Sequence, residues 1–250
     1  MARQTWTFDE TLVAFNVYCR TPFGRLHARN PEIIRVADAL GRTPSALAMK
    51  CCNIASFDPA LQARGISGLR KASRLDREVW EAFETDPETV GFDSERAFAA
   101  TTCRRLRTAR RIEWEDIQGL DKTAVTKVRV NQRLFRSIVL SGYDGRCAVC
   151  RIPVARLLVA AHIIPWSKDS THRMNPRNGI CLCSIHDKAF DSGLLLIDEQ
   201  YLVSVASSIQ KLHDDEAVGI FFLRYEGARI HLPDRWQPDP HLLKRHCEFV

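Results

Sequence analysis

The sequence lacks the features that would place it in a membrane. No stretch of the 250-residue chain approaches the ~20 consecutive apolar residues that a membrane-spanning helix needs. The first residues, MARQTWTFDETL, lack the apolar centre of a secretory signal. Internal repeats and low-complexity segments are missing as well. These absences predict a cytoplasmic protein with no membrane partner, and they argue against a repeat architecture.

A strong excess of charge is also missing. The chain has 36 basic and 30 acidic residues, which gives a formal net charge of +6. This mild basic balance is weaker than that of a histone-like protein, but it suits an enzyme whose substrate is a polyanion. The hydrophobic content of 45% is ordinary, and the length allows one large or two modest domains. Nine cysteines in a reducing cytoplasm predict buried or metal-bound thiols rather than a disulfide framework.

Residues 5–56 have the pattern of a compact helical unit. Apolar residues recur at helical spacing over residues 8–19. Pro31 suits the first turn of a second helix, and Thr43 followed by Pro44 predicts the start of a third helix. A helix, a short glycine-containing turn and another helix form the layout of a helix-turn-helix.

The same segment loosely resembles the Myb/SANT-like trihelical DNA-binding modules. The resemblance lies in the pattern W-T-x-x-E, followed by L-G-R-T-P-S-A-L-A-x-K. It implies that the third helix faces the major groove, with Arg42, Ser45 and Lys50 near phosphates or base edges. The alternative is a plain helical subdomain in which Arg42 only closes a turn.

An arginine-rich segment follows the helical part. The sequence CRRLRTARR, residues 103–111, carries five arginines and no acid. Arginine forks fit phosphate oxygens, although such a run is also typical of a solvated linker. We therefore place a helical DNA-recognition domain at 1–102, a basic linker or helix at 103–128 and a second domain at 129–250. The arginines expected to contact DNA are Arg104, Arg105, Arg107, Arg110 and Arg111.

The second domain holds the most informative stretch. It contains CAVC from Cys147, then LLVAAHIIPWS, then RMNPRNGICLCSIHDKAFDSG. The apolar run before His162 predicts a strand that ends at or just beyond that residue. Asn178-Gly179 marks a tight turn, after which a short strand passes into a helix that carries His186. A helix that begins near Val125 is expected to pack against this block.

This block resembles the HNH endonuclease domain of the restriction-enzyme type. The resemblance rests on AHIIPW, NPRNG and IHDKAFDSG, and it covers roughly residues 130–200. It implies a ββα-metal nuclease domain within 129–250. The expected fold class is therefore α+β, with an N-terminal helical, helix-turn-helix-like domain and a C-terminal nuclease domain.

The resemblance also implies roles for three residues. His162 is expected to be the general base, because the unperturbed pKa of histidine lies near working pH. Asn178 is expected to fix the strand–loop geometry or to supply an oxygen ligand. His186 is expected to ligate the catalytic ion, which stabilises the departing oxygen. The ion is expected to be Mg²⁺, or Mn²⁺ or Ni²⁺ because an imidazole is among the ligands.

One position departs from the broader HNH pattern. Many members carry an acidic residue or a histidine immediately before the base, and this chain has Ala161 there. The protein ligands of the ion are therefore few, and Asp187 and Asp191 are the candidates to complete the set. For Asp191 the alternative is a turn-capping role with Ser192-Gly193.

Four cysteines form a candidate zinc site. Cys147 and Cys150 make a Cys-x-x-Cys knuckle, while Cys181 and Cys183 would share one face of a strand. Together they would supply a tetrahedral structural Zn²⁺ site. Two alternatives stay open: buried free cysteines, or a Cys183-x-x-His186 pair that would remove His186 from catalysis.

The C-terminal part predicts small strands and a helix. LLLIDEQYLVSVA indicates two strands around the turn at 198–200, and FFLRYEGARIHLP indicates a second such pair around Gly227. A short helix is expected after Pro240.

The predicted function is metal-dependent cleavage of double-stranded DNA in restriction or phage defence. Family analogy extends this to modified bases, although no residue type here reads a modification. A homodimer is expected, because one ββα-metal site cuts one strand. The alternatives are a helix-turn-helix regulator whose nuclease fold is inactive, and a homing or recombination nuclease.

Overall fold

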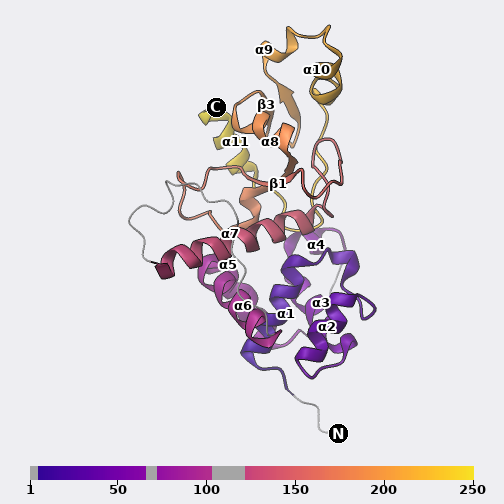
Figure 1. Ribbon diagram of the computed structural model, residues 1–250, viewed down its shortest axis with the longest axis vertical. Helices are drawn as coiled ribbons and strands as arrows, with labels where there is room; N and C mark the ends of the chain where they lie inside the picture. Colours follow the sequence, from indigo (N-terminus) through magenta and orange to yellow (C-terminus); the bar gives the residue numbers. More distant parts are fainter. Residues whose placement is uncertain (1–4, 66–71, 103–121) are drawn as a thin grey trace. The chain divides into compact units, whose positions relative to one another are not determined.

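The computed structural model describes residues 5–65, 72–102 and 122–250 (Figure 1). The chain divides into two compact units, Met1–Ser141 and Gly142–Val250. The described part of the first unit is helical, and all described strands lie in the second, which confirms the α+β class. The five arginines of the segment 103–111 lie outside the described residues.

Capping side chains set where the first helices begin. Thr7 and Glu10 form a capping box at the start of α1. Asn30 caps α2 and Thr43 caps α3, each directly before a proline, which confirms the predicted starts of these two helices. The helices of the first unit are α1 (Phe8–Arg20), α2 (Pro31–Ala39), α3 (Pro44–Ala55), α4 (Pro59–Ala63), α5 (Arg74–Thr85), α6 (Pro87–Thr101) and α7 (Lys122–Gly142), with a 3₁₀ turn at Phe23–Arg25.

Helix α1 forms the centre of the first unit. It packs against α3, α5 and α6, so residues on every side of the helix are buried. The ring of Phe15 lies 4.8 Å from that of Phe83, measured between centroids. Asn16 is fully buried and donates from Nδ2 to Ser94 Oγ at 3.0 Å, which satisfies a polar group in the core.

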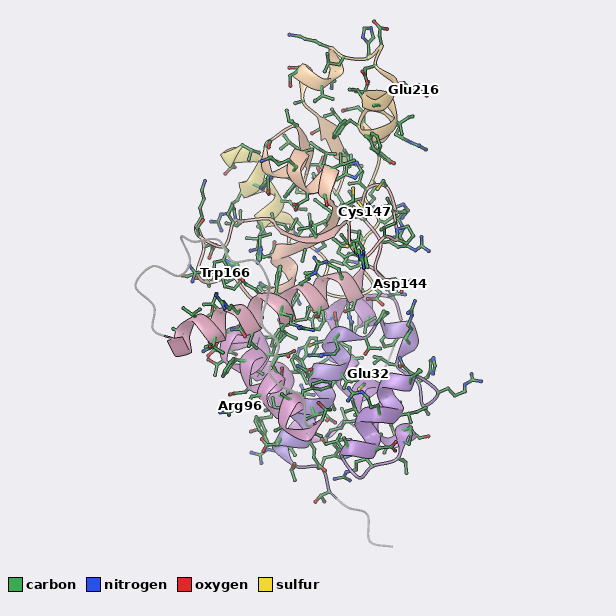
Figure 2. The ribbon with its side chains drawn as sticks, in the orientation of Figure 1. Glu32, Arg96, Asp144, Cys147, Trp166 and Glu216 are labelled. Atoms are coloured by element: carbon green, nitrogen blue, oxygen red, sulfur yellow. The ribbon has the colours of Figure 1, made fainter. Side chains whose placement is uncertain are left out.

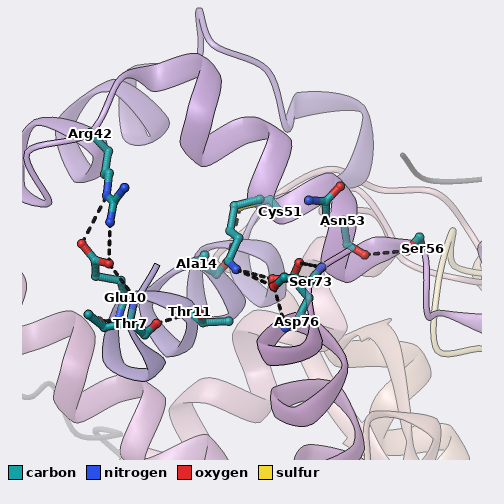
Figure 3. Close-up of polar contacts among 11 residues, drawn as sticks. Thr7, Glu10, Thr11, Ala14, Arg42, Cys51, Asn53, Ser56, Ser73 and Asp76 are labelled. Carbon is teal, nitrogen blue, oxygen red and sulfur yellow. Dashed lines mark hydrogen bonds and ion pairs between the residues drawn. The ribbon is translucent and has the colours of Figure 1, made fainter. Parts of the chain in front are cut away.

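The α2–turn–α3 segment has the layout of a helix-turn-helix. Two of the side chains expected to contact DNA, Arg42 and Lys50, form ion pairs with acidic residues of the same unit. Gly41 adopts a φ of +63° in the turn, a conformation that favours glycine. Arg42 pairs with Glu10 at 2.8 Å (Figure 3). It also donates to the backbone carbonyl of Thr5. The alternative in which Arg42 closes the turn therefore describes this residue. Ser45 is exposed on the first turn of α3.

Lys50 also differs from its expected role as a DNA contact. Its ammonium lies 2.5 Å from a carboxylate oxygen of Asp76, and the two side chains are 3% and 1% exposed. Asp76 also accepts the backbone N–H of Ser73, so the pair ties α3 to the start of α5 (Figure 3). A charge buried in this way cannot reach a phosphate without breaking the pair.

Helix α7 belongs to the helical unit, which corrects the expected boundary at 128/129. Ser141 Oγ donates to the carbonyl of Cys19 at 2.7 Å, and Asn131 Nδ2 donates to the carbonyl of Glu88 at 3.0 Å. These bonds hold α7 to α1 and α6. The second unit therefore begins at Gly142.

The second unit is built around a hairpin and a helix. Its elements are β1 (Leu158–His162), β2 (Gly179–Cys183), α8 (Ser184–Asp191), β3 (Leu195–Ile197), β4 (Val203–Val205), α9 (Ser207–Gln210), α10 (Glu216–Phe221) and α11 (Pro240–Phe249), with 3₁₀ turns at Pro176–Asn178 and Leu223–Tyr225. Strands β1 and β2 pair antiparallel, as do β3 and β4. The predicted strands around residues 198–200 and the helix after Pro240 are thus confirmed.

The second predicted strand pair, around Gly227, is wrong. Helix α10, capped by Asp215, extends to Phe221, and a 3₁₀ turn at Leu223–Tyr225 occupies the position of the first predicted strand. One isolated bridge, between Leu202 and Arg229, is what remains of strand pairing there. Across the described ranges, every helix is too short or too polar to span a bilayer.

We expect Lys50→Ala to lower the free energy of unfolding by about 3 kcal/mol, because it leaves the buried Asp76 carboxylate without its cation. Urea unfolding followed by circular dichroism measures this. The matched control is Arg77→Ala, which breaks an exposed pair with Glu81 and should cost less than about 0.5 kcal/mol. Equal effects of the two substitutions would contradict the buried pair.

Candidate active site and metal centre

The second unit presents a hairpin followed directly by a helix. In the register of the hairpin, His162 at the end of β1 faces Gly179 at the start of β2, and Leu158 faces Cys183. Cys183 is both the last residue of β2 and the residue before α8. The predicted strand ending at His162 and the predicted helix carrying His186 are both confirmed.

A cluster of four possible metal ligands lies at the Cys183 end of the hairpin. It consists of Cys147, Cys150, Cys183 and His186, and their ligand atoms all lie within 4.8 Å of one another. His186 Nδ1 lies 3.2 Å from Cys183 Sγ and 3.5 Å from Cys147 Sγ. Cys150 Sγ lies 3.9 Å from Cys183 Sγ. Figure 2 marks Cys147 in the loop before β1.

These donors fit a tetrahedral zinc ion. Bonds of about 2.3 Å to sulfur and 2.1 Å to nitrogen place neighbouring ligand atoms about 3.5–3.8 Å apart. The contacts within the cluster are close to that spacing. Three thiols and one imidazole form a common structural zinc set, and we name this group the Cys₃His centre.

The residues around His186 leave its Nδ1 atom available as a metal ligand. Its Nε2 lies 2.9 Å from the carbonyl oxygen of Phe221, an acceptor, so Nε2 carries the hydrogen and Nδ1 is left as the ligand. The rings of Phe222 and Tyr225 pack edge-on against the imidazole. The segment after α10 therefore holds His186 in the orientation that points Nδ1 at the three sulfurs.

The electrostatics of the thiols also suit a cation. The hydrogen bond from Cys147, together with the nearby His186, lowers the pKa of the Cys183 thiol to about 3. The same hydrogen bond and burial raise the pKa of Cys147. Cys183 is therefore a thiolate at neutral pH, and a thiolate is the form that binds metal.

The expected zinc set was wrong in one member. Cys181 is fully buried but lies outside the cluster, two residues back along β2 from Cys183, and its carbonyl accepts the N–H of Ala148 at 2.7 Å. The ligand atoms that lie within 4.8 Å of one another come from Cys147, Cys150, Cys183 and His186, and the thiol of Cys181 is not among them. His186, one helical turn after Cys183, takes the fourth place.

His162 lies at the other end of the hairpin. Its Nε2 contacts the carbonyl of Arg173 at 3.1 Å, and its half-buried ring packs edge-on against Trp166. Because a carbonyl only accepts, Nε2 carries the hydrogen and Nδ1 is the basic nitrogen of the neutral ring. Burial lowers the pKa of His162 to about 4, against a smaller opposing effect of the Arg173 carbonyl.

The separation of the two histidines corrects the role expected for His186. Four residue steps lie between the strand positions 158 and 162, which is about 13 Å along β1. His186 faces the cysteines at one end, and His162 occupies the other end. The two imidazoles therefore lie at different ends of the hairpin, and the geometry fits His186 as a member of the Cys₃His centre rather than as a ligand beside His162.

The C-terminal end of α8 lies near His162. His246 on α11 contacts the carbonyl of Ile163 at 2.8 Å through Nδ1 and the carbonyl of Phe190 at 3.2 Å through Nε2. Those two oxygens are thus about 8 Å apart at most. They belong to the residue after His162 and the residue before Asp191, so the base and the end of α8 converge. No sequence motif had indicated His246, because its partners are backbone atoms.

Helix α8 carries two carboxylates that are candidate oxygen ligands, Asp187 in its first turn and Asp191 at its end. Asp187 and Asp191 are four residues apart and so share a helix face. Burial raises the pKa of Asp187 to about 6, and the charges of Asp191 and Cys183 add to the rise. The turn after α8 is closed by backbone bonds, with Leu194 N–H donating to the carbonyl of Ala189. Paired carboxylates whose mutual repulsion is felt in this way fit a hard divalent cation such as Mg²⁺.

Asn178 is buried and bonded on both sides of its amide. Its Oδ1 accepts the N–H of Ile164 at 2.8 Å, and its Nδ2 donates to the carbonyls of Ile164 and His172. These bonds lock the loop that follows His162. Of the two roles considered for Asn178, this geometry fits the structural one and leaves its oxygen turned away from any ion.

The sequence comparison identifies this block. Residues 147–198 match a family model described as HNH endonuclease. This part of the chain belongs to the HNH endonuclease family. The HNH match starts at the first ligand of the Cys₃His centre and ends just after β3, so it contains the hairpin, α8 and both carboxylates. Comparison with curated proteins gives no match.

Membership in the HNH family indicates a nuclease that uses a divalent metal and acts on DNA. The matched segment does not include the helical unit. The role of residues 1–141 must therefore be inferred from the structure of that unit alone. Within the matched segment, the Cys₃His centre and His162 lie at opposite ends of the hairpin.

We expect Cys183→Ala to abolish the binding of one zinc per chain, and Cys181→Ala to retain it, because only the first thiol is in the Cys₃His centre. Metal analysis of the purified variants by mass spectrometry measures the zinc content. The two substitutions remove the same group from the same strand, so each controls for the other. Zinc retained by the first and lost by the second would contradict the assignment.

We expect the His162 ring to stay neutral from about pH 8 down to about pH 5.5, because its lowered pKa of about 4 lies below that window. A histidine with an ordinary pKa of about 6.5 would become mostly protonated over the same range. Nitrogen-15 NMR of the imidazoles follows the ring, with His162→Gln assigning the signal. A midpoint near pH 6.5 would contradict the buried environment.

Proposed function

We propose that the chain is a metal-dependent DNA endonuclease in which His162 is the general base and Asp187 and Asp191 hold the catalytic ion. The observation that carries this proposal is the convergence of the end of β1 and the end of α8 on the His246 ring. It supports a site in which the strand end that carries His162 lies near the last turn of α8, which carries Asp191, within the segment that matches the HNH family.

The chemistry required of His162 agrees with its hydrogen bonding. The bond to the Arg173 carbonyl keeps the proton on Nε2, so Nδ1 is able to take a proton from water. The hydroxide attacks phosphorus and the bond to the leaving oxygen breaks. A divalent ion held by the two carboxylates would stabilise the charge on that oxygen.

The Cys₃His centre supports this site without taking part in the reaction. It fixes the knuckle and the N-terminal end of α8. The ion at the carboxylates is proposed to be Mg²⁺, with Mn²⁺ or Ni²⁺ as substitutes. A zinc ion is proposed for the Cys₃His centre, because thiolate ligands favour it over hard cations.

The biological role is proposed to be restriction or phage defence. The support is the combination of an HNH nuclease segment with a separate helical unit whose α2–turn–α3 has the layout of a DNA-binding module. Ser45 at the start of α3 remains a candidate contact to DNA. Recognition of modified bases is part of the same proposal. Double-strand cleavage would need two copies of the chain, because one such site cuts one strand.

We expect His162→Ala to slow the nicking of supercoiled plasmid about 10²-fold or more while leaving DNA affinity nearly unchanged, because it removes the proton acceptor and no phosphate contact. Gel analysis of plasmid with Mg²⁺, Mn²⁺ or Ni²⁺ measures nicking. Asp191→Asn should abolish the metal response, and Asp214→Asn, which changes an exposed acid, should not.

Nicking by His162→Ala at the wild-type rate would exclude this residue as the base. Binding of duplex DNA by the wild-type chain without any cleavage would favour a DNA-binding regulator with an inactive nuclease fold. Preferential cutting of branched DNA would favour a recombination nuclease. Paired modified and unmodified phage DNAs test the dependence on modification.

A further inference from the structure

The loop between β1 and β2 holds both His162 and Asn178 through two consecutive carbonyl groups. The carbonyl of Arg173 accepts from His162 Nε2 at 3.1 Å. The carbonyl of His172, the residue before, accepts from Asn178 Nδ2 at 3.2 Å. The short segment 172–173 therefore sets the orientation of the proposed base and the shape of the loop around it.

Asp169 fixes this segment with both of its carboxylate oxygens. Oδ1 accepts the backbone N–H groups of Thr171 and His172 at 3.0 and 3.2 Å. Oδ2 accepts from the ring of His172 at 2.8 Å and from Arg245 on α11 at 3.3 Å. Burial opposes the charge of Asp169, but the bonds from His172 and Thr171 outweigh it and lower its pKa. Asp169 is therefore a carboxylate at neutral pH.

The Asp169–His172 pair leaves one nitrogen of the ring for another partner. Nδ1 is bonded to the carboxylate, and in the described part of the chain Nε2 has no hydrogen-bond partner. The side chain of His172 is 32% exposed. Because residue 173 touches the ring of His162, the Cα of His172 lies within about 10 Å of that ring. A second imidazole is thus presented beside the proposed base.

We propose that His172 is a second substrate-contacting histidine, which donates from Nε2 to a phosphate oxygen of the DNA strand bound at His162. This inference rests on the proposed nuclease function. The carboxylate of Asp169 accepts from Nδ1 and so orients the ring, as an aspartate does beside a catalytic histidine. An imidazolium N–H and a phosphate oxygen form a charge-assisted hydrogen bond. Asp169 is a positioning residue, which acts through His172.

The alternative is that Asp169 and His172 only brace the loop. The two roles differ in salt dependence, because each phosphate that a protein neutralises steepens the fall of log K with log salt by about 0.9. If Asp169 and His172 only hold the loop in place, removing either side chain would lower affinity or cleavage without changing that slope. A lost phosphate contact changes the slope itself.

The test measures binding of a duplex oligonucleotide by fluorescence anisotropy over a series of salt concentrations. It is made at about pH 6, where an ordinary histidine is mostly protonated. The full chain carries His162→Ala and no divalent ion is added, so that the DNA stays whole. We expect His172→Gln to make the slope shallower by about 0.9. Asp169→Asn should shift it in the same direction. The matched control is His213→Gln, an exposed histidine beside Asp214, which should leave the slope unchanged.

A slope that is the same with and without His172 would overturn the proposal, even if affinity fell. Failure of the His162→Ala chain to bind duplex DNA at all would overturn it as well. The proposed function is read separately, from plasmid nicking by the wild-type chain. Absence of nicking together with the expected change in slope would reject the nuclease function and keep the phosphate contact of His172.

Discussion

The antiparallel register of β1 and β2 determines which side chains of the HNH segment can act together. By pairing Leu158 with Cys183 and His162 with Gly179, it sends the end of β2 and the end of β1 to opposite ends of one short hairpin. Helix α8 starts at the first of these ends and finishes near the second. The hairpin therefore carries a thiol-rich cluster at one end and the imidazole of His162 at the other.

The Cys₃His centre and the two carboxylates of α8 offer different types of metal ligand. The Cys₃His centre gathers sulfur and nitrogen ligands in a buried place, where a single bound cation neutralises charges that burial would otherwise make costly. Asp187, the residue after His186, is only partly buried, and burial together with the charges of Asp191 and Cys183 makes its own charge harder to maintain. Soft donors in the Cys₃His centre and hard donors in the two carboxylates would select different ions from the same solution.

The sequence predicts the elements of this site better than it predicts their partners. The strand before His162, the turn at Asn178 and the helix with His186 follow from local apolar patterns and turn residues. The choice between Cys181 and His186 as zinc ligand does not, because it depends on where β2 ends and α8 begins. That single boundary decides whether the i, i+2 spacing of a strand or the i, i+3 spacing of a helix applies.

Other contacts have no local signal at all. His246 reaches the carbonyls of Ile163 and Phe190 from α11, more than fifty residues away in sequence. Arg42 and Lys50 look like surface cations of a recognition helix, yet Glu10 and Asp76 pair with them inside the helical unit. The sequence pattern gives the spacing of a charged residue along a helix but not its partner, so the pairing of these two cations inside the unit could not be predicted.

Helix α8 links the Cys₃His centre to the proposed active site through adjacent residues. His186 is a ligand of the centre, and Asp187 is the next residue. At the far end, Phe190 stacks on His246 with ring centroids 3.8 Å apart, which anchors the last turn. A helix of eight residues is too short to be stable without such anchors, so both ends must be held for the carboxylates to keep their places. A zinc ion at the Cys₃His centre would thus fix the start of the helix that carries the two proposed carboxylate ligands.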